Sequence, residues 1–383
     1  MACIVRALPG YGDIPANFPI IVDEGMAIIE PAFAYLHELA TIPGRSHAAE
    51  TIRTYGEHLH DWLDSLEQSR IAWDGVGERE IAAWRNRMLE CPSPHTKRPY
   101  ARSTINDRVR TVCRFYGWAH QRGWIAELPF HYIDVRVLHR RQSMLAHLDV
   151  RPGVVTANAL TVSEAERLPR ALRADQLRRL FSALAPPYDL MASWALVTGI
   201  RRKELCALKL FQIPETAHLD ADEHPLIGIG LRITKGGYPR TVYPPIRLLD
   251  ATHRYIDEVR GPLIRRLRRA DRSWPAPSAL FLTSRGGPVS AARFTAAMGT
   301  AFKAAGVIGT GHWLRHCFAM TMLAQLQRQA RTTPEINPLK VVQVLLGHRS
   351  IASTAIYLRC VEMHAAELEE SVAWLYGALI DDG

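Results

Sequence analysis

Four short segments in the second half of the chain concentrate side chains that can do acid–base and nucleophilic chemistry. They are residues 198–205 (TGIRRKEL), 233–242 (ITKGGYPRTV), 311–316 (GHWLRH) and 345–359 (LLGHRSIASTAIYLR). Together they supply two arginines, a lysine, two histidines and a tyrosine, namely Arg201, Lys235, His312, Arg315, His348 and Tyr357. Several cationic or basic groups collected with one tyrosine indicate a site for an anionic substrate, with the tyrosine as nucleophile.

This set of side chains fits phosphoryl transfer. Two arginines can clamp the non-bridging oxygens of a phosphate with paired hydrogen bonds, and each preorganised donor of this kind is worth about 10²–10³ in rate. A free tyrosine phenol has a pKa of about 10, so it needs neighbouring cations or a base before it can attack at neutral pH. Because no pair of carboxylates for metal ions accompanies the set, we expect no metal and no cofactor.

The third segment has two simpler interpretations. His312, Arg315 and His316 stand at positions i, i+3 and i+4, so a helix would place them on one face. That crowding lowers stability unless an anion binds there, but the face could also be a solvated basic surface. His312 and His316 could instead bind a metal, although Arg315 between them repels a cation and no carboxylate lies close in the sequence.

Periodicity and turn residues predict the elements that position these segments. Helices are expected over residues 174–185 and 188–198 and again after Gly199. A hairpin of strands 227–234 and 240–243 follows, with its turn at Lys235-Gly236-Gly237. Helices fill most of the remainder, and residues 364–379 have the pattern of an amphipathic tail helix. We therefore assign residues 169–383 to a mixed α/β catalytic domain that ends in a C-terminal tail helix.

The first half of the chain is predicted to be helical. Helices are expected from Ala48, over residues 78–89 and over residues 103–122, which gives a small all-helical domain at 48–130. Residues 1–47 form a leader whose role the sequence leaves open, with one short helix around 25–39. Residues 131–168 lack steady periodicity and contain two basic stretches, so they are expected to be a linker that touches DNA or a solvated loop. The expected fold class is mainly α with a small β-hairpin.

Charge and composition restrict the partners. The chain has 383 residues and a net charge of +9, while residues 1–50 hold only two arginines against six acids. A basic body suggests a polyanion, most commonly nucleic acid. Six scattered cysteines without a C-x-x-C pair fit a reducing compartment. No apolar run approaches the roughly 20 residues that span a bilayer, and the first residues lack a secretion signal. We expect a cytoplasmic protein with no membrane partner.

In this order and spacing, the four segments resemble the catalytic domain of the tyrosine recombinase (phage integrase) family. The matching patterns are T-G-I-R-x-x-E-L, H-x-L-R-H and L-L-G-H-x-S-I-x-x-T-x-x-Y-x-R, and the resemblance covers about residues 170–360. The helical region at 48–130 resembles the family's core-binding domain, which binds DNA. Residues 1–45 have no counterpart in it.

The resemblance implies a role for each residue that would meet the phosphate. Arg201 and Arg315 would bind the scissile phosphate, and His348 would form a hydrogen bond to one of its oxygens. Glu204 matches a buried acid of the family that orients the first arginine rather than reacting.

The resemblance also implies the movement of protons. Tyr357 would attack to give a 3′-phosphotyrosine and a free 5′-hydroxyl, with His312 as general base. Lys235 would protonate the leaving 5′-oxygen, and His316 would have a structural role. Because the covalent intermediate keeps the energy of the ester bond, religation would need neither ATP nor metal.

The implied function is site-specific DNA recombination by an integrase or transposase of a mobile element. Its partners would be double-stranded DNA at specific sites, three further copies of the chain in a homotetramer on two sites, and sister recombinases or accessory DNA-bending proteins. A type IB topoisomerase shares the nucleophile and the two arginines, although the core-binding-like helices favour recombination. The complete catalytic set argues against a non-catalytic DNA-binding relative. The lack of clustered Asp and Glu argues against a metal-dependent nuclease. The target sequence and the direction of recombination stay open.

Overall fold

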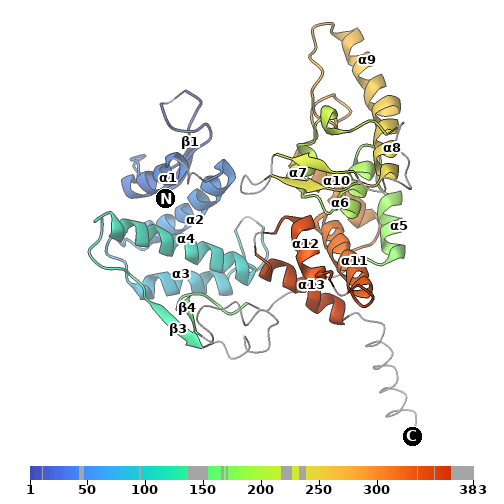
Figure 1. Ribbon diagram of the computed structural model, residues 1–383. Helices are drawn as coiled ribbons and strands as arrows, with labels where there is room; N and C mark the ends of the chain where they lie inside the picture. Colours follow the sequence, from blue (N-terminus) through green and yellow to red (C-terminus); the bar gives the residue numbers. More distant parts are fainter. Residues whose placement is uncertain are drawn as a thin grey trace, which may run out of the picture. The chain divides into compact units, whose positions relative to one another are not determined.

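The computed structural model of this chain describes residues 1–10, 12–42, 47–94, 96–136, 154–164, 168–169, 171–216, 227–232, 239–333, 335–348 and 350–363. The chain divides into two compact units, Met1–Glu166 and Arg167–Gly383. Helices dominate both units, and the named strands pair into three two-stranded antiparallel sheets (Figure 1). The expected fold class, mainly helical with a small β component, is confirmed.

The first unit combines four helices with two small hairpins. Three helices are expected here, from residue 48 onwards, over 78–89 and over 103–122. The structure has them as α2 (Ala49–Gln68), α3 (Glu78–Glu90) and α4 (Arg102–Gln121), within two residues of every expected bound. The elements are β1 (Cys3–Arg6), β2 (Pro19–Val22), α1 (Glu30–Thr41), α2 (Ala49–Gln68), α3 (Glu78–Glu90), α4 (Arg102–Gln121), β3 (Tyr132–Arg136) and β4 (Val154–Asn158).

The leader contributes to the core of this first unit. Tyr35 and Leu36 of α1 are 3% and 0% exposed, and the Tyr35 ring meets that of Phe115 on α4 with centroids 5.6 Å apart. Ile21 of β2 is also fully buried. Burial of these apolar side chains removes them from water and stabilises the unit. The segment that the sequence leaves without a role is therefore part of the packed structure.

The described part of the segment expected to be a linker packs on the first unit. Strands β3 and β4 pair, from Tyr132 opposite Asn158 to Arg136 opposite Val154. The Asn106 side chain binds the backbone of Val162 in both directions, with both hydrogen bonds at 2.8 Å. The pairing of strands separated by 17 residues depends on tertiary contacts, and local periodicity does not reveal it.

The second unit is built around α6, whose Met191 and Trp194 are fully buried. The Trp194 indole donates a hydrogen bond to Thr252 of α8 at 3.0 Å. The elements are α5 (Ala174–Ser182), α6 (Tyr188–Thr198), α7 (Arg202–Cys206), a 3₁₀-helix (Leu210–Gln212), β5 (Ile229–Leu231), β6 (Arg240–Val242), α8 (Ile246–Tyr255), a π-helical segment (Ile256–Arg260), α9 (Gly261–Ala270), α10 (Ala291–Ala304), α11 (His312–Ala330), α12 (Pro338–Leu346) and α13 (Ala352–Met363).

The expected hairpin of the second unit is present as β5 and β6, with Leu231 opposite Arg240. Residues 233–238, which include Lys235, lie outside the described residues, as does the expected tail helix at 364–379. None of the helices that the structure describes has the length and apolar character needed to cross a bilayer.

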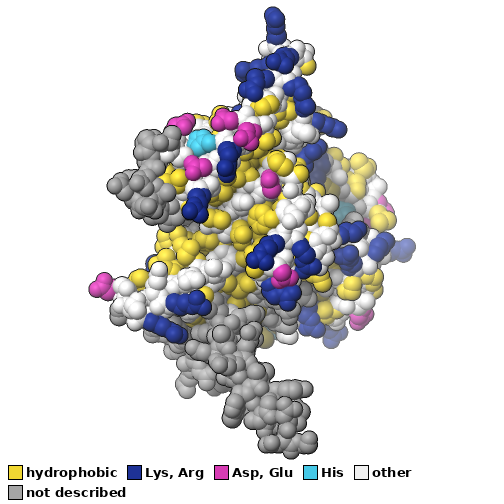
Figure 2. Space-filling view, turned by 90° about the vertical axis from the view of Figure 1, so that its right-hand side faces the viewer, with side chains coloured by type: hydrophobic (Ala, Val, Ile, Leu, Met, Phe, Trp, Pro, Cys, Tyr) yellow, Lys and Arg dark blue, Asp and Glu magenta, His cyan; other side chains and the backbone are white. Residues whose placement is uncertain are grey.

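A basic helix projects from the second unit. Helix α9 has no buried residue, and Figure 1 shows it extending away from α11–α13. In Figure 2, Lys and Arg side chains gather along this projecting end. The exposed arginines of this helix are Arg265, Arg266, Arg268 and Arg269.

Helices α11, α12 and α13 form a smaller core of their own within the second unit. Leu323, Val342 and Leu346 are fully buried there, and Tyr357 of α13 is 3% exposed. Two of the four chemistry-bearing segments, 311–316 and 345–359, lie on these helices. Their packing therefore determines where the side chains of these segments meet.

Candidate active site

Two glycine turns give the site its shape. Helix α6 ends at Gly199 and α12 ends at Gly347, both with φ of +61°, a conformation that favours glycine. A Cβ on Gly199 would lie 2.4 Å from the ring of Phe318, and one on Gly347 would lie 2.5 Å from the Arg240 side chain. Each glycine thus allows a neighbouring side chain to come close to the end of a helix.

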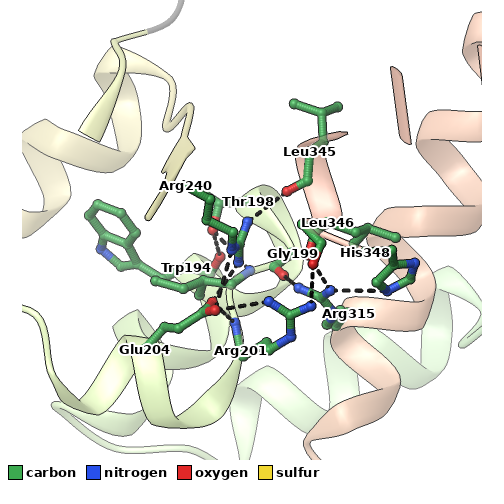
Figure 3. Close-up of polar contacts among 12 residues, drawn as sticks. Trp194, Thr198, Gly199, Arg201, Glu204, Arg240, Arg315, Leu345, Leu346 and His348 are labelled. Carbon is green, nitrogen blue, oxygen red and sulfur yellow. Dashed lines mark hydrogen bonds and ion pairs between the residues drawn. The ribbon is translucent and has the colours of Figure 1, made fainter. Parts of the chain in front are cut away.

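Three arginines bind successive carbonyls at the C-terminal end of α12 (Figure 3). Arg240 donates to the carbonyl of Leu345 at 2.6 Å, and Arg315 donates to that of Leu346 at 2.6 Å. Arg201 donates to the next carbonyl, that of Gly347, at 2.8 Å. The last carbonyls of a helix lack intrahelical partners and lie at the negative end of its dipole. This helix end can therefore hold three like charges close together.

Glu204 compensates part of this charge. Its carboxylate is 1% exposed and pairs with Arg240 at 2.5 Å and with Arg201 at 2.9 Å, and it also accepts the Arg201 backbone N–H at 2.9 Å. Burial alone would raise the pKa of Glu204, but the hydrogen bond and charge of Arg240, followed by the bonds from Arg201, lower it. Glu204 is therefore ionised, and it contacts Arg201, as the family resemblance implies.

Arg315 is more enclosed than Arg201. Arg315 is 2% exposed and donates to the carbonyl of Gly199 as well as to that of Leu346. Burial, and then the charges of Arg201 and Arg240, lower the pKa of Arg315 to about 9, which still leaves it protonated at neutral pH. The Arg201 side chain is 23% exposed. Arg201 is thus the more accessible of the two predicted phosphate ligands.

His348 is held by hydrogen bonds on both ring nitrogens. Its Nε2 lies 3.3 Å from Arg315 and its Nδ1 lies 2.9 Å from the hydroxyl of Thr354. Because a guanidinium can only donate, Nε2 must accept, and the proton of the neutral ring is on Nδ1. Burial, followed by Arg315, Arg201 and Arg240, lowers the pKa of His348 to about 4. The ring is neutral at physiological pH.

Tyr357 lies against two imidazoles. Its hydroxyl is 2.9 Å from Nδ1 of His316, and its ring stacks on that of His348 with an interplanar angle of 13°. Burial raises the pKa of Tyr357, while the charge of Arg315 opposes that rise. Burial, and then His312 and Arg315, lower the pKa of His316 to about 4. A neutral imidazole thus stands at the phenol, able to accept its proton.

The structure brings Arg201, Arg315, His348 and Tyr357 together, joined by His316 and Arg240. The ring of His312 meets that of His316 edge-on, with centroids 4.5 Å apart. His312, the expected base, therefore contacts His316, and it is His316 that contacts the phenol of Tyr357. The sequence placed His316 on the same helix face as His312 but gave it a structural role, whereas here its ring contacts the Tyr357 hydroxyl. Arg240 carried no signal in the sequence beyond its position in the hairpin. Among the described residues, no three His, Cys, Asp or Glu side chains are grouped so as to hold a metal ion.

Comparison with known proteins identifies the class. The model described as the phage integrase family matches residues 170–364, more than half of the chain. The tyrosine recombinase XerC of Mycobacterium leprae is 30% identical over 87% of this chain and 94% of its own length. The XerC of Halalkalibacterium halodurans is 26% identical over 82% of this chain and 88% of its own. A lambda integrase dimer bound to a COC′ core site has a similar fold, with a TM-score of 0.56 and 17% identity over 86% of this chain and 94% of that one.

The site and the fold together define an enzyme that transfers DNA strands. The chain belongs to the phage integrase family and is a tyrosine recombinase. The chemistry of this family fits catalysis without metal or ATP.

Proposed function

We propose that this recombinase integrates or transposes a mobile element by cutting and rejoining DNA at specific sites, with Tyr357 as the nucleophile. One observation carries the proposal. The Tyr357 hydroxyl lies on a neutral imidazole, beside a cluster of arginines that is larger than one carboxylate can neutralise. Such a site favours the dianionic pentavalent transition state over the monoanionic phosphodiester from which it forms.

The scissile phosphate would be bound by the remaining donors of two arginines. A guanidinium carries five N–H donors. Arg201 uses one on Glu204 and one on Gly347. Arg315 uses three, on Gly199, Leu346 and His348. Each arginine therefore keeps at least two donors for phosphate oxygens, while its other bonds fix its orientation in advance.

Attack would transfer the phenol proton to His316 as the Tyr357 oxygen bonds to phosphorus. The bond from phosphorus to the 5′-oxygen breaks, and that oxygen takes a proton from Lys235, which leaves a 3′-phosphotyrosine and a 5′-hydroxyl. His312 is the base implied by the family resemblance. It is exposed and its ring contacts that of His316, so it would be the second imidazole, after His316, on the side of the phenol. His348 accepts a hydrogen bond from Arg315 before DNA binds; as the neutral tautomer with its proton on Nε2 it would donate a hydrogen bond to a phosphate oxygen.

Tyr357 has to be uncovered before it can react, since it is 3% exposed. We propose that DNA binding and assembly on two sites move α13 and expose the hydroxyl. The active form would be a homotetramer in the cytoplasm, in which the segment 364–379 docks on a neighbouring protomer. Sister recombinases or DNA-bending proteins would join it. The core-binding domain would be residues 48–130, the linker 131–168 and the catalytic domain 169–383.

A plasmid assay tests the function. Two copies of the attachment site from the ends of the element that encodes the protein are placed on one supercoiled plasmid, and a plasmid without sites serves as control. We expect deletion or inversion between the sites, in the presence of EDTA and without ATP, and no reaction of the control. Relaxation of both plasmids without recombination would contradict the proposal and favour a type IB topoisomerase.

A further inference from the structure

We propose that Arg240 is a positioning residue of the phosphate site: it takes up the charge of Glu204 and so keeps Arg201 available as a cation for the scissile phosphate. The inference deepens the proposed function and rests on it. Arg240 belongs to none of the roles that the catalytic motifs assign, and it lies on β6, far in sequence from both Glu204 and α12.

Arg240 is placed to act through its neighbours rather than on DNA. Its side chain is 8% exposed, and its Nη2 and Nε donate to the two carboxylate oxygens of Glu204 at 2.5 and 3.3 Å. Its Nη1 donates to the carbonyl of Leu345 at 2.6 Å. In Figure 3 the guanidinium lies between Glu204 and the end of α12. This two-pronged geometry matches the planar fork of arginine, which lysine cannot reproduce.

The charges show what Arg240 does. Glu204 pairs with both Arg201 and Arg240. If Arg240 were neutral, the buried carboxylate would pair with Arg201 alone. The charges of Glu204 and Arg201 would then cancel, and Arg201 would attract the phosphate less. With Arg240 present, Arg201, Arg240 and Arg315 outweigh Glu204 and leave a net positive field. Because opposite charges in a buried site are weakly screened, this difference acts directly on the phosphate.

The same residue fixes two elements that carry other parts of the site. Its hydrogen bond to Leu345 ties the start of β6 to the end of α12, three residues before His348. Leu231 pairs with Arg240, so the backbone of Arg240 is fixed in the hairpin of β5 and β6. Gly347 makes this possible, since a Cβ there would overlap the Arg240 side chain.

The experiment compares Arg240→Met, Arg240→Lys, Glu204→Gln and the double variant Glu204→Gln/Arg240→Met. The rate of covalent adduct formation is measured on a nicked duplex of the attachment site at saturating protein, together with the dissociation constant for the intact duplex and the melting temperature. Arg260→Met is the matched control, because Arg260 is also buried and donates to backbone carbonyls, those of Pro277 and Ala279.

We expect Arg240→Met to lower the adduct rate by about tenfold or more, as for loss of a preorganised electrostatic group, with little change in the dissociation constant. The double variant should recover most of that rate, because the charge that Arg240 balances is gone. Arg240→Lys should be intermediate. Arg260→Met should melt earlier, yet react at the wild-type rate when folded.

Two results would overturn the inference: an unchanged rate in Arg240→Met, or a double variant no faster than Arg240→Met. If Arg240→Met does not fold, the comparison of the neutral variant Arg240→Gln with Glu204→Gln/Arg240→Gln decides in the same way. Failure of the proposed function looks different, since the wild-type protein would then form no adduct at all or would relax the plasmid without recombination.

Discussion

The histidines of the site are neutral in the fold, and this makes stability depend on pH. The pKa values of His316 and His348 are lowered to about 4, first by burial, whereas an unfolded histidine titrates near 6.5. Between these two values the unfolded chain binds more protons than the folded one. Above pH 6.5 the histidines therefore do not lower the free energy of unfolding. As the pH drops from 6.5 towards 4, that free energy falls.

We predict that the melting temperature of the protein is lower at pH 5.5 than at pH 7.5. The slope contributed by each histidine is at most about 1.4 kcal/mol per pH unit. The His316→Gln variant should show a smaller difference between the two pH values, because it has lost one titrating group. A wild-type melting temperature that is equal or higher at pH 5.5 would contradict the assignment of neutral rings.

At the residue scale, sequence motifs predicted the members of the site better than their contacts. The spacing of the motifs indicated Arg201, Arg315, His348 and Tyr357, and the fold brings these four together. The contact between His316 and Tyr357 depends on how α13 packs against α11. No spacing in the sequence encodes that packing.

At the scale of elements, the end of α12 organises the cations. Gly347 has a φ of +61°, and a Cβ there would lie 2.5 Å from Arg240. We predict that Gly347→Ala lowers the adduct rate and destabilises the protein by about 1–2 kcal/mol or more, the cost of the left-handed conformation for a residue with a Cβ. Melting curves and adduct formation on the nicked duplex measure both effects.

The matched control is Gly299→Ala in α10, where nothing lies within 4 Å of an added Cβ. Alanine is the better helix former by up to about 1 kcal/mol, so this variant should be at least as stable as the wild type and fully active. A Gly347→Ala variant indistinguishable from Gly299→Ala would show that the arginines do not depend on this turn.

The longer helices of the first unit were largely predictable because they carry several turns of apolar periodicity, as α2 (Ala49–Gln68) shows with Ile52, Leu59, Trp62 and Leu66 buried. The short strands were not. Strands β1 and β2 have four residues each, which is too short for an alternating pattern to stand out. Their pairing depends on burial against α2, a tertiary effect. The core contribution of the leader could therefore be seen only in the fold.

At the scale of the whole molecule, the net charge of +9 should govern DNA affinity. We predict that the logarithm of the binding constant falls linearly with the logarithm of salt concentration, with a slope of about −0.9 per phosphate contacted. Fluorescence anisotropy of a labelled attachment-site duplex between 50 and 300 mM salt measures it. The exposed arginines of α9 contribute to this positive charge. Replacing them with glutamine measures how much of the salt dependence comes from this helix. An affinity independent of salt would contradict a basic DNA-binding face.

The central claim is that Tyr357 forms a covalent bond to DNA, and a nicked duplex that traps the intermediate tests it most directly. The wild-type protein, Tyr357→Phe and the control Tyr243→Phe are incubated with a nicked duplex whose cleaved strand is labelled at its 5′ end and are separated on a denaturing gel, and the adduct is mapped by peptide mass spectrometry. Tyr243 follows β6 and is 41% exposed, so it is an accessible competitor beside the hairpin. The account predicts a metal-independent adduct on the peptide that contains Tyr357, present in the wild type and in Tyr243→Phe. The same adduct should be absent from Tyr357→Phe, which still binds the duplex. An adduct that persists in Tyr357→Phe, or that maps to another residue, would contradict it.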